Sequence, residues 1–410
     1  MRRLILGSTI LLTAACSLLT GPGDGPPSLL DPLPRELSDD EKALIDAGNQ
    51  FTFVLFREAT RELTPDSNAL LSPLSASMAL GMTLNGAGGT TLDSMRVALR
   101  VEGRALESIN RGYQSLIALL TALDPTTEIN IANSVWSHIM FPIRAEFVET
   151  ARTWFDAEAR SVDFDDPATL SLINGWVKEK TRNRIPELLK QIDFGEVAFL
   201  INAIYFKGQW RARFDPSDTR NRPFHGADAT RDVPMMSRAG KVRLANRSDY
   251  QAVELLYGNG AFAMTILLPR QDLTPREVLD GLTPDSWRAL TESFAEAELP
   301  LVLPKFKFDF ARELEDPLSA MGMRIAFDGR VADLYGIADV RPERLFLTRV
   351  TQKAFIEVNE EGTEAAAATA VGVGATSVPQ SVVVDRPFLF AIRERLSGTI
   401  LFIGQVNSLK

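Results

Sequence analysis

The sequence predicts an α+β fold in which helical segments come first and most strands follow. Helical periods, with apolar residues three or four positions apart, fall mainly in the first 185 residues. Strand-like runs rich in Val, Ile and Phe dominate the rest of the chain. Because helices and strands are segregated rather than alternating as βαβ units, we expect an antiparallel or mixed sheet. The hydrophobic fraction of 45% is sufficient for a sizeable core.

The elements follow in order along the chain. The predicted helices cover residues 40–62, 72–84, 105–123, 145–158, 169–183 and 316–323. The predicted strands cover residues 129–134, 198–206, 251–256, 262–268, 299–303, 354–358, 388–393 and 399–405. Ser38-Asp-Asp-Glu41 is typical of a capping box at the start of the first helix. Since no repeat or second linker follows, residues 38–410 are predicted to form a single domain.

The N-terminus, residues 1–16, is predicted to be a targeting segment. Arg2 and Arg3 precede an apolar run from Leu4 to Ala15 that is too short to span a bilayer as a helix. Cys16 follows and is the only cysteine, which excludes an intramolecular disulfide. The arrangement resembles a bacterial lipoprotein signal, in which the cysteine is lipidated and becomes the mature N-terminus. The alternative is an ordinary secretory signal. Both predict export, either to the cell envelope or to the exterior.

Residues 17–37 are predicted to be a linker. The stretch Gly21-Pro-Gly-Asp-Gly-Pro-Pro27 cannot hold a helix or a central strand. A linker of this length could hold the domain tens of ångströms from a membrane. The net charge of −9 argues against a nucleic-acid partner, which would require a basic patch.

Conventional enzyme chemistry has little support in the sequence. The two histidines, His138 and His225, are dispersed, and a metal site needs clustered ligands. The chain contains no Gly-x-Ser-x-Gly elbow, His-Glu-x-x-His pair or phosphate-binding loop. We therefore expect no catalytic residue, no metal and no cofactor.

The most informative segment is residues 358–378, which has four consecutive alanines and no Lys, Arg or aromatic residue. Every second side chain in it is small and uncharged: Thr363, Ala365, Ala367, Thr369, Val371, Val373 and Ala375. A strand with this pattern can bury one face in a sheet. With its glycines and small residues, the same segment also suits an exposed loop. It is therefore a candidate conformational switch.

Several motifs follow one another in a characteristic order. They are Asn68-Ala-Leu-Leu-Ser-Pro-Leu-Ser-Ala-Ser77, Gly86-Ala-Gly-Gly-Thr-Thr91, Asn174-Gly-Trp-Val-Lys-Glu-Lys-Thr181, Asn202-Ala-Ile-Tyr-Phe-Lys-Gly-Gln-Trp210, Val233-Pro-Met-Met236, Leu303-Pro-Lys-Phe-Lys307, Met321-Gly-Met323, Glu360-Glu-Gly-Thr-Glu-Ala-Ala-Ala-Ala-Thr369 and Asp385-Arg-Pro-Phe388. From about residue 40 onward, the chain resembles the serpin family, and residues 360–369 resemble the hinge of its inhibitory members. The resemblance implies three β-sheets surrounded by about eight or nine helices, with an exposed reactive loop at about residues 360–385.

The resemblance implies a function that depends on being cleaved. In this family an exposed loop is offered to a serine protease, and an acyl-enzyme forms. The cleaved loop then inserts into the main sheet as a further strand, which displaces and distorts the protease. Insertion requires small, uncharged inward side chains, because a buried charge costs several kcal/mol. The set from Thr363 to Ala375 meets this requirement. We expect a suicide-substrate inhibitor; the alternative is a non-inhibitory binding or structural protein.

Two spacings in the family's pattern place the cleaved bond at Thr376–Ser377. Thr376 is the fourteenth residue after Gly362 and lies eleven residues before Pro387. Ala375–Thr376 is the alternative bond. The small β-branched side chain of Thr376 suits the primary pocket of elastase-like or subtilisin-like proteases and offers nothing to the aspartate of a trypsin pocket.

The resemblance also assigns supporting positions. Ser72, Ser75, Asn202 and Gln352 correspond to a polar cluster beneath the point where the sheet opens, and Trp210 lies near the place where the loop first enters. Gln352 stands where the family often has histidine; it can donate and accept hydrogen bonds but cannot gain a charge. The alternative interpretation of the two serines is a helix cap and helix packing. The expected protein is a monomer whose partners are serine proteases.

Overall fold

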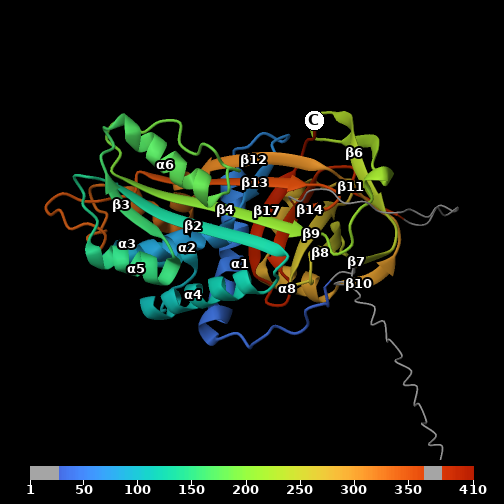
Figure 1. Ribbon diagram of the computed structural model, residues 1–410, viewed down its shortest axis with the longest axis horizontal. Helices are drawn as coiled ribbons and strands as arrows, with labels where there is room; N and C mark the ends of the chain where they lie inside the picture. Colours follow the sequence, from blue (N-terminus) through green and yellow to red (C-terminus); the bar gives the residue numbers. More distant parts are fainter. Residues whose placement is uncertain (1–26, 364–380) are drawn as a thin grey trace, which may run out of the picture.

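The computed structural model describes residues 27–363 and 381–410. Within these residues the chain forms the predicted α+β fold, with three β-sheets and nine α-helices (Figure 1). The helices are α1 (Asp39–Thr60), α2 (Pro73–Leu84), α3 (Gly89–Leu99), α4 (Leu106–Ala122), α5 (Ala145–Phe155), α6 (Pro167–Lys180), α7 (Pro275–Gly281), α8 (Pro284–Glu292) and α9 (Glu315–Leu318).

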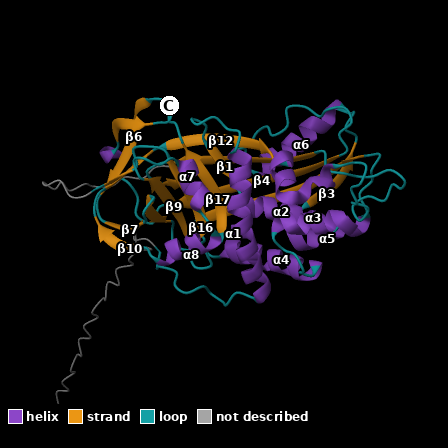
Figure 2. Cartoon of the chain, turned by 180° about the vertical axis from the view of Figure 1, so that it is seen from behind, coloured by secondary structure: helices purple, strands orange, loops and turns teal. Residues whose placement is uncertain are grey.

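A six-stranded sheet runs the length of the molecule, and helices cover both of its faces. Its strands, in spatial order, are β12 (Phe306–Glu313), β13 (Arg349–Val358), β14 (Gly362–Thr363), β4 (Ala198–Gln209), β2 (Thr127–His138) and β3 (Glu158–Val162). In Figure 1, α6 lies in front of this sheet, whereas α1 to α5 lie behind it and come forward in Figure 2. Alternate residues of β4 face the two layers: Phe199 and Ile201 belong to the smaller core under α6, and Leu200 and Ile204 to the main core.

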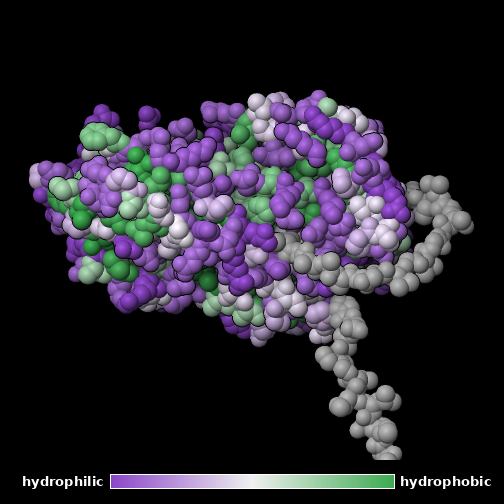
Figure 3. Space-filling model, turned by 45° about the horizontal axis from the view of Figure 1, so that its top comes forward, coloured by the Kyte–Doolittle hydropathy of each residue, from purple (hydrophilic) through white to green (hydrophobic). Residues whose placement is uncertain are grey.

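The other two sheets pack around the opposite half of the molecule. The seven-stranded sheet consists of β1 (Ala69–Leu71), β17 (Ile400–Val406), β16 (Phe388–Glu394), β9 (Phe262–Pro269), β8 (Tyr250–Leu256), β7 (Lys241–Asn246) and β10 (Ala295–Glu298). The four-stranded sheet consists of β15 (Val382–Val383), β11 (Leu301–Pro304), β6 (Thr230–Arg238) and β5 (Arg220–His225). Hydrophilic side chains cover much of the face seen in Figure 3. In the described part of the chain, no helix is both long enough and apolar enough to cross a bilayer.

Each predicted helix and strand overlaps an element of the structure, with some differences at the ends. The helix expected over residues 145–158 ends at Phe155, because Asp156 takes a left-handed conformation (φ 47°) and β3 begins two residues later. The helix expected over residues 316–323 is α9 followed by a wider turn, Ser319–Met323, with a kink at Gly322. Three described helices, α3, α7 and α8, and eight described strands, β1, β3, β5, β6, β7, β10, β12 and β15, were not predicted.

The start of the first helix matches the sequence prediction. Ser38 caps α1, and the reciprocal capping box with Glu41 is present. Residues 27–37, expected to be part of a linker, lie against the domain instead of extending away from it. The Leu30 N–H donates to the carbonyl oxygen of Asn259 at 2.7 Å, and the Arg395 guanidinium donates to the Leu30 carbonyl at 2.6 Å. The prolines and glycines exclude helix, but they leave backbone carbonyls free to bind arginines.

Candidate functional site

A two-residue strand, β14, lies in the middle of the six-stranded sheet. At one end of the sheet β13 and β4 pair with each other directly, Arg349–Lys353 against Phe199–Ala203. At the other end β14 lies between them, so that Thr363 pairs with Val358 on one side and Gly208 on the other. A longer strand in the position of β14 would therefore require β13 and β4 to separate.

The turn that leads into β14 is held by the side chain of Asn359. Its Oδ1 accepts from the N–H groups of Glu361 at 3.0 Å and Gly362 at 3.3 Å. The indole Nε1 of Trp210 donates to the Asn359 carbonyl at 2.9 Å, and the Trp210 N–H donates to the Glu361 carbonyl at 2.7 Å. Trp210, predicted to lie near the loop's point of insertion, thus binds the turn through both its backbone and its side chain.

Gly362 fits here because its backbone touches the neighbouring strand. A Cβ atom at this position would lie 2.1 Å from the carbonyl oxygen of Gly208 and 2.7 Å from the Cα of Gln209. Both neighbouring atoms belong to backbone that is fixed by the sheet. Any side chain at residue 362 would consequently push β14 away from β4.

Glu360 connects the hinge to the four-stranded sheet. Its carboxylate lies 2.8 Å from the Lys305 ammonium and accepts a hydrogen bond from the Thr219 hydroxyl at 2.7 Å. Burial alone would raise the pKa of Glu360, but the hydrogen bonds from Lys305 and Thr219 outweigh burial, so the pKa lies below its ordinary value. The Phe214 N–H donates to the Glu360 carbonyl at 2.9 Å. Glu360 is therefore fixed through both its side chain and its backbone.

Tyr257, which was not predicted, completes the hinge contacts. Its ring stacks on Trp210 with centroids 4.5 Å apart, and its hydroxyl lies 2.7 Å from the Thr363 Oγ1. Burial raises the pKa of Tyr257, so the hydroxyl stays protonated and can donate or accept. Thr363, the first of the predicted inward-facing residues, is buried against it.

The predicted sheet-opening residues meet at the joint between β13 and β4. Gln352 and Asn202 are register partners, and the Gln352 Nε2 donates to Asn202 Oδ1 at 2.5 Å. Gln352 also accepts from the Ser72 N–H at 2.7 Å and donates to the Ser72 carbonyl at 2.9 Å, while Asn202 Nδ2 donates to Ser75 Oγ. All four residues are buried. The structure brings them together across the joint; their role in opening remains a prediction.

Ser72 also has the structural role that the alternative interpretation predicts, because it caps a helix. It is the N-cap of α2, because its Oγ accepts from the Ser75 N–H at 3.4 Å, and it donates to the Leu401 carbonyl at 2.7 Å. Asn133 of β2 extends the cluster, since its Oδ1 accepts from Asn202 Nδ2 at 2.6 Å. The sequence prediction missed this residue, although a polar amide within an apolar strand was a usable signal.

The remaining predicted site residues lie outside the described part of the chain. These are the loop residues Ala365, Ala367, Thr369, Val371, Val373 and Ala375, the proposed cleavage pair Thr376 and Ser377, and the lipidation candidate Cys16. The chain is described again from residue 381, and β15 then pairs in parallel with β11. The positions of the loop residues, of the cleavage pair and of Cys16 remain predictions.

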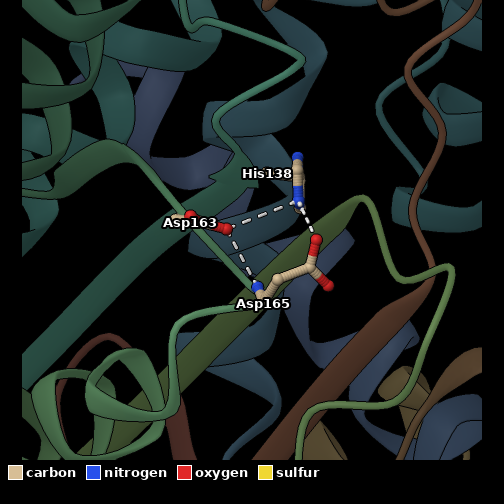
Figure 4. A group of neighbouring side chains, drawn as sticks. All are labelled: His138, Asp163 and Asp165. Atoms are coloured by element: carbon tan, nitrogen blue, oxygen red, sulfur yellow. Dashed lines mark hydrogen bonds and ion pairs between the residues drawn. The ribbon is translucent and has the colours of Figure 1, made fainter.

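A second group of side chains forms at the far end of β2 (Figure 4). His138 Nε2 lies 3.9 Å from Asp163 Oδ1 and 3.7 Å from Asp165 Oδ2. The sequence treated His138 as isolated, but folding places two carboxylates near it. Its Nδ1 accepts from the Met140 N–H at 3.1 Å, so the neutral ring carries its proton on Nε2. A metal ligand needs the opposite arrangement, and the group therefore suits a contact between an imidazole donor and two carboxylates.

The hinge and the joint define a class of protein in which a short strand separates two central strands that pair directly at their other end. The family profile described as serpin (serine protease inhibitor) matches residues 46–409. The chain therefore belongs to the serpin family.

Several known proteins are similar to this chain in sequence or structure along most of its length. The leukocyte elastase inhibitor of Bos taurus is 36% identical over 88% of this chain and 98% of its own. An uncharacterized serpin-like protein of Thermococcus kodakarensis is 34% identical over 90% of this chain and 87% of its own. The crystal structure of the thermophilic serpin tengpin in the native state superposes with a TM-score of 0.84 and 28% identity, covering 92% of this chain and 96% of that one. A complex of thyroxine-binding globulin with thyroxine has a TM-score of 0.81 and 27% identity over 89% and 99%.

Proposed function

We propose that the protein is a suicide-substrate inhibitor of serine proteases. The position of β14 is the observation that carries this proposal. If the strand continued in the register of Thr363 against Val358 and Gly208, each following loop residue would pair with the preceding residue of β13 and of β4. Ala368 would then pair with Lys353 and Ala203. Residues beyond that point can enter the sheet only by separating β13 from β4.

The composition of the loop supports insertion. In the same register Thr369 would lie opposite Gln352 and Asn202, and its side chain would point to the face that carries the polar cluster. A small hydroxyl can join the hydrogen bonds of such a cluster. A bulky or charged side chain would be buried there with some of its hydrogen bonds to water unreplaced. The alternating small residues up to Ala375 extend the pattern beyond this point.

The proposed target is an elastase-like or subtilisin-like protease, with cleavage at Thr376–Ser377. The similarity to the leukocyte elastase inhibitor of Bos taurus agrees with a small residue in the protease's primary pocket. The test is incubation with pancreatic elastase, subtilisin and trypsin, followed by denaturing electrophoresis and mass spectrometry. We expect a covalent complex with elastase or subtilisin, none with trypsin at the loop, and a released fragment beginning at Ser377. A fragment beginning at Thr376 would select the alternative bond.

A non-inhibitory binding function is the second candidate, because thyroxine-binding globulin is among the similar structures. Cleavage of the loop by every protease, without any covalent complex, would favour it.

For the N-terminus we propose lipidation at Cys16 and location on a bacterial cell envelope. Metabolic labelling with a palmitate analogue tests this, with Cys16→Ser as the control; unlabelled wild-type protein would favour an ordinary secretory signal.

A further inference from the structure

A pocket of about 270 Å³ lies beside the seven-stranded sheet, next to the chain segment that follows β4. Its apolar lining includes the half-buried Leu256, and the buried Val242 and Leu255 belong to the core beneath it. Four cationic side chains also line it: Arg211, Arg238, Lys241 and Arg243. Within a chain of net charge −9, this concentration of positive charge is unexpected.

The two carboxylates of the pocket do not balance these cations. Glu296 pairs with Lys241 at 3.1 Å. The buried Glu254 is shared, because it lies 2.6 Å from the Nε of Arg243 and also pairs with the buried Arg393 behind the pocket. One carboxylate thus faces two guanidinium groups, and no carboxylate of the lining remains for the other cations.

Among the described residues, no carboxylate pairs with Arg211 or Arg238. Arg211 Nη1 donates to the carbonyls of Pro27 at 2.6 Å and Gly258 at 3.0 Å, which are neutral acceptors. The Arg238 guanidinium lies 5.5 Å from the ring centroid of Phe214, and its Nη1 makes one long bond of 3.3 Å to the Lys241 carbonyl.

The environment of Arg238 indicates a missing partner. Its Nε is buried and has no hydrogen-bond partner among the described residues. Burial lowers the pKa of Arg238, and no carboxylate in the described part of the chain counteracts that shift. Removing the Nε of a guanidinium from water without a hydrogen-bond partner is costly, and a bound anion that accepts from it would offset that cost.

We propose that this pocket binds a small organic anion, with a carboxylate or phosphate at Arg238 and Arg211 and a short apolar body against the half-buried Leu256. The planar guanidinium fork matches both head groups. The volume is near the lower end of small-molecule pockets, so the ligand is compact. A polyanion fits less well, because the cations surround a pocket and do not form an extended surface track.

The pocket is distinct from the hinge, and Phe214 contacts residues of both. Phe214 packs under Arg238, and its N–H donates to the Glu360 carbonyl. The proposal of an anion site does not depend on protease inhibition, and a binding measurement can fail without affecting the inhibitor proposal.

The first test uses the full chain and isothermal titration calorimetry. The probes are octanoate and octyl phosphate, with inorganic phosphate and 1-octanol as matched compounds that each lack one half of the ligand. We expect one site per chain for at least one of the first two, with a Kd about tenfold or more below those of the matched compounds. Binding of 1-octanol as tight as that of both anions would overturn the proposal, as would the absence of binding by either anion. The two amphipathic probes distinguish carboxylate from phosphate as the head group.

The second test uses variants. Arg238→Met removes the charge while keeping a long side chain over Phe214, and should weaken binding about tenfold or more. Arg222→Met is the control, since Arg222 is an exposed arginine on β5, away from the pocket lining. Ala212→Trp, at the exposed rim, keeps every cation but fills the pocket, and should also abolish binding. If Arg238→Met does not fold, Ala212→Trp decides. Unchanged affinity in either folded variant, or an equal loss in Arg222→Met, would overturn the proposal.

Discussion

At the scale of single residues, the hinge depends on backbone that leaves no room for a side chain. Gly362 touches the carbonyl of Gly208 so closely that even a methyl group would collide with it. A collision with sheet backbone cannot be relieved by rotating a side chain. The first residues of the loop therefore remain in the sheet only because residue 362 is glycine.

We expect Gly362→Ala to displace β14 and lower the free energy of unfolding by roughly 1–3 kcal/mol. Loss of the contact between Thr363 and the Tyr257 hydroxyl would accompany the change. Urea unfolding measures the effect. Gly48→Ala is the control, because a Cβ on Gly48 in α1 meets nothing within 4 Å and alanine should favour the helix by up to about 1 kcal/mol. Equal stability of Gly362→Ala and the wild type would contradict the proposed collision.

A second prediction concerns acid and Glu41. Burial alone would raise the pKa of this carboxyl, but hydrogen bonds from Arg35, the Ser38 N–H and the Ser115 hydroxyl outweigh burial and lower the pKa to about 2. Because the folded pKa is lowered, the stabilisation is present above the ordinary value of 4.5 and is lost as the pH falls from 4.5 toward 2. Its size is on the order of 2 kcal/mol, since Arg35 is partly exposed.

The measurement is the unfolding free energy at pH 6 and at pH 3. Glu41→Gln should lose stability at pH 6 and show a smaller difference between the two pH values than the wild type. Glu107→Gln, which removes an exposed partner of Arg111, should leave that difference unchanged. If Glu41→Gln kept the wild-type difference, the carboxylate would not be the acid-sensitive group.

At the scale of elements, strands buried on both faces were predicted well, whereas short, partly exposed strands at or next to a sheet edge were not. Both β4 and β9 are continuous apolar runs because each packs against two layers, and such runs are visible without a structure. By contrast β5, β7 and β10 are short and largely polar, so their register depends on partners far along the chain. The alternating residues of β12, Phe306–Glu313, and the capping box of α7 were available signals that were not used.

The site residues also divide into those that were predicted from the sequence and those that were not. The motif order of the family indicated Ser72, Asn202 and Gln352, and the structure brings them together. Tyr257 could not be predicted, because only the packing of β8 beside the hinge brings its hydroxyl to Thr363. The grouping of two aspartates near His138 likewise depends on how β2 and β3 pair.

The element-scale prediction is that Thr369→Arg converts the inhibitor into a substrate. In the register proposed for insertion, residue 369 faces Gln352 and Asn202, where an arginine would be buried without a carboxylate. The ratio of covalent complex to cleaved product, read from denaturing gels, should fall about tenfold or more. Ala366→Arg is the control, because residue 366 would point to the other face of the sheet, near the half-buried Phe355. An unchanged ratio for Thr369→Arg would refute the register.

At the scale of the whole molecule, the proposed function predicts that the central sheet gains a longer strand on cleavage. Between β13 and β4, the described part of β14 has only two residues. Insertion of the following loop residues would exchange the direct β13–β4 hydrogen bonds for two full ladders and would bury one row of small side chains. If insertion occurs as proposed, the native state is expected to be less stable than the cleaved state.

Cleavage of the loop should therefore raise the melting temperature, by about 5 °C or more for a domain of this size. Differential scanning calorimetry before and after nicking by a protease that does not remain bound measures the shift. The nicked Thr369→Arg protein should show a smaller rise, because its loop is expected to stop part of the way. A nicked wild-type protein that melts at or below the temperature of the intact one would count against insertion.

The docked segment at residues 27–37 sets the orientation of the molecule on a cell surface, provided that Cys16 carries lipid. Pro27 is held by Arg211, the residue next to the hinge-binding Trp210. Ten residues separate Cys16 from Pro27, a reach of at most about 40 Å. The hinge end would then face the bilayer. Insertion of residues 364–375 toward the Arg349 end of the sheet spans about 40 Å, so a protease captured close to the lipid would finish on the side that faces away from the cell.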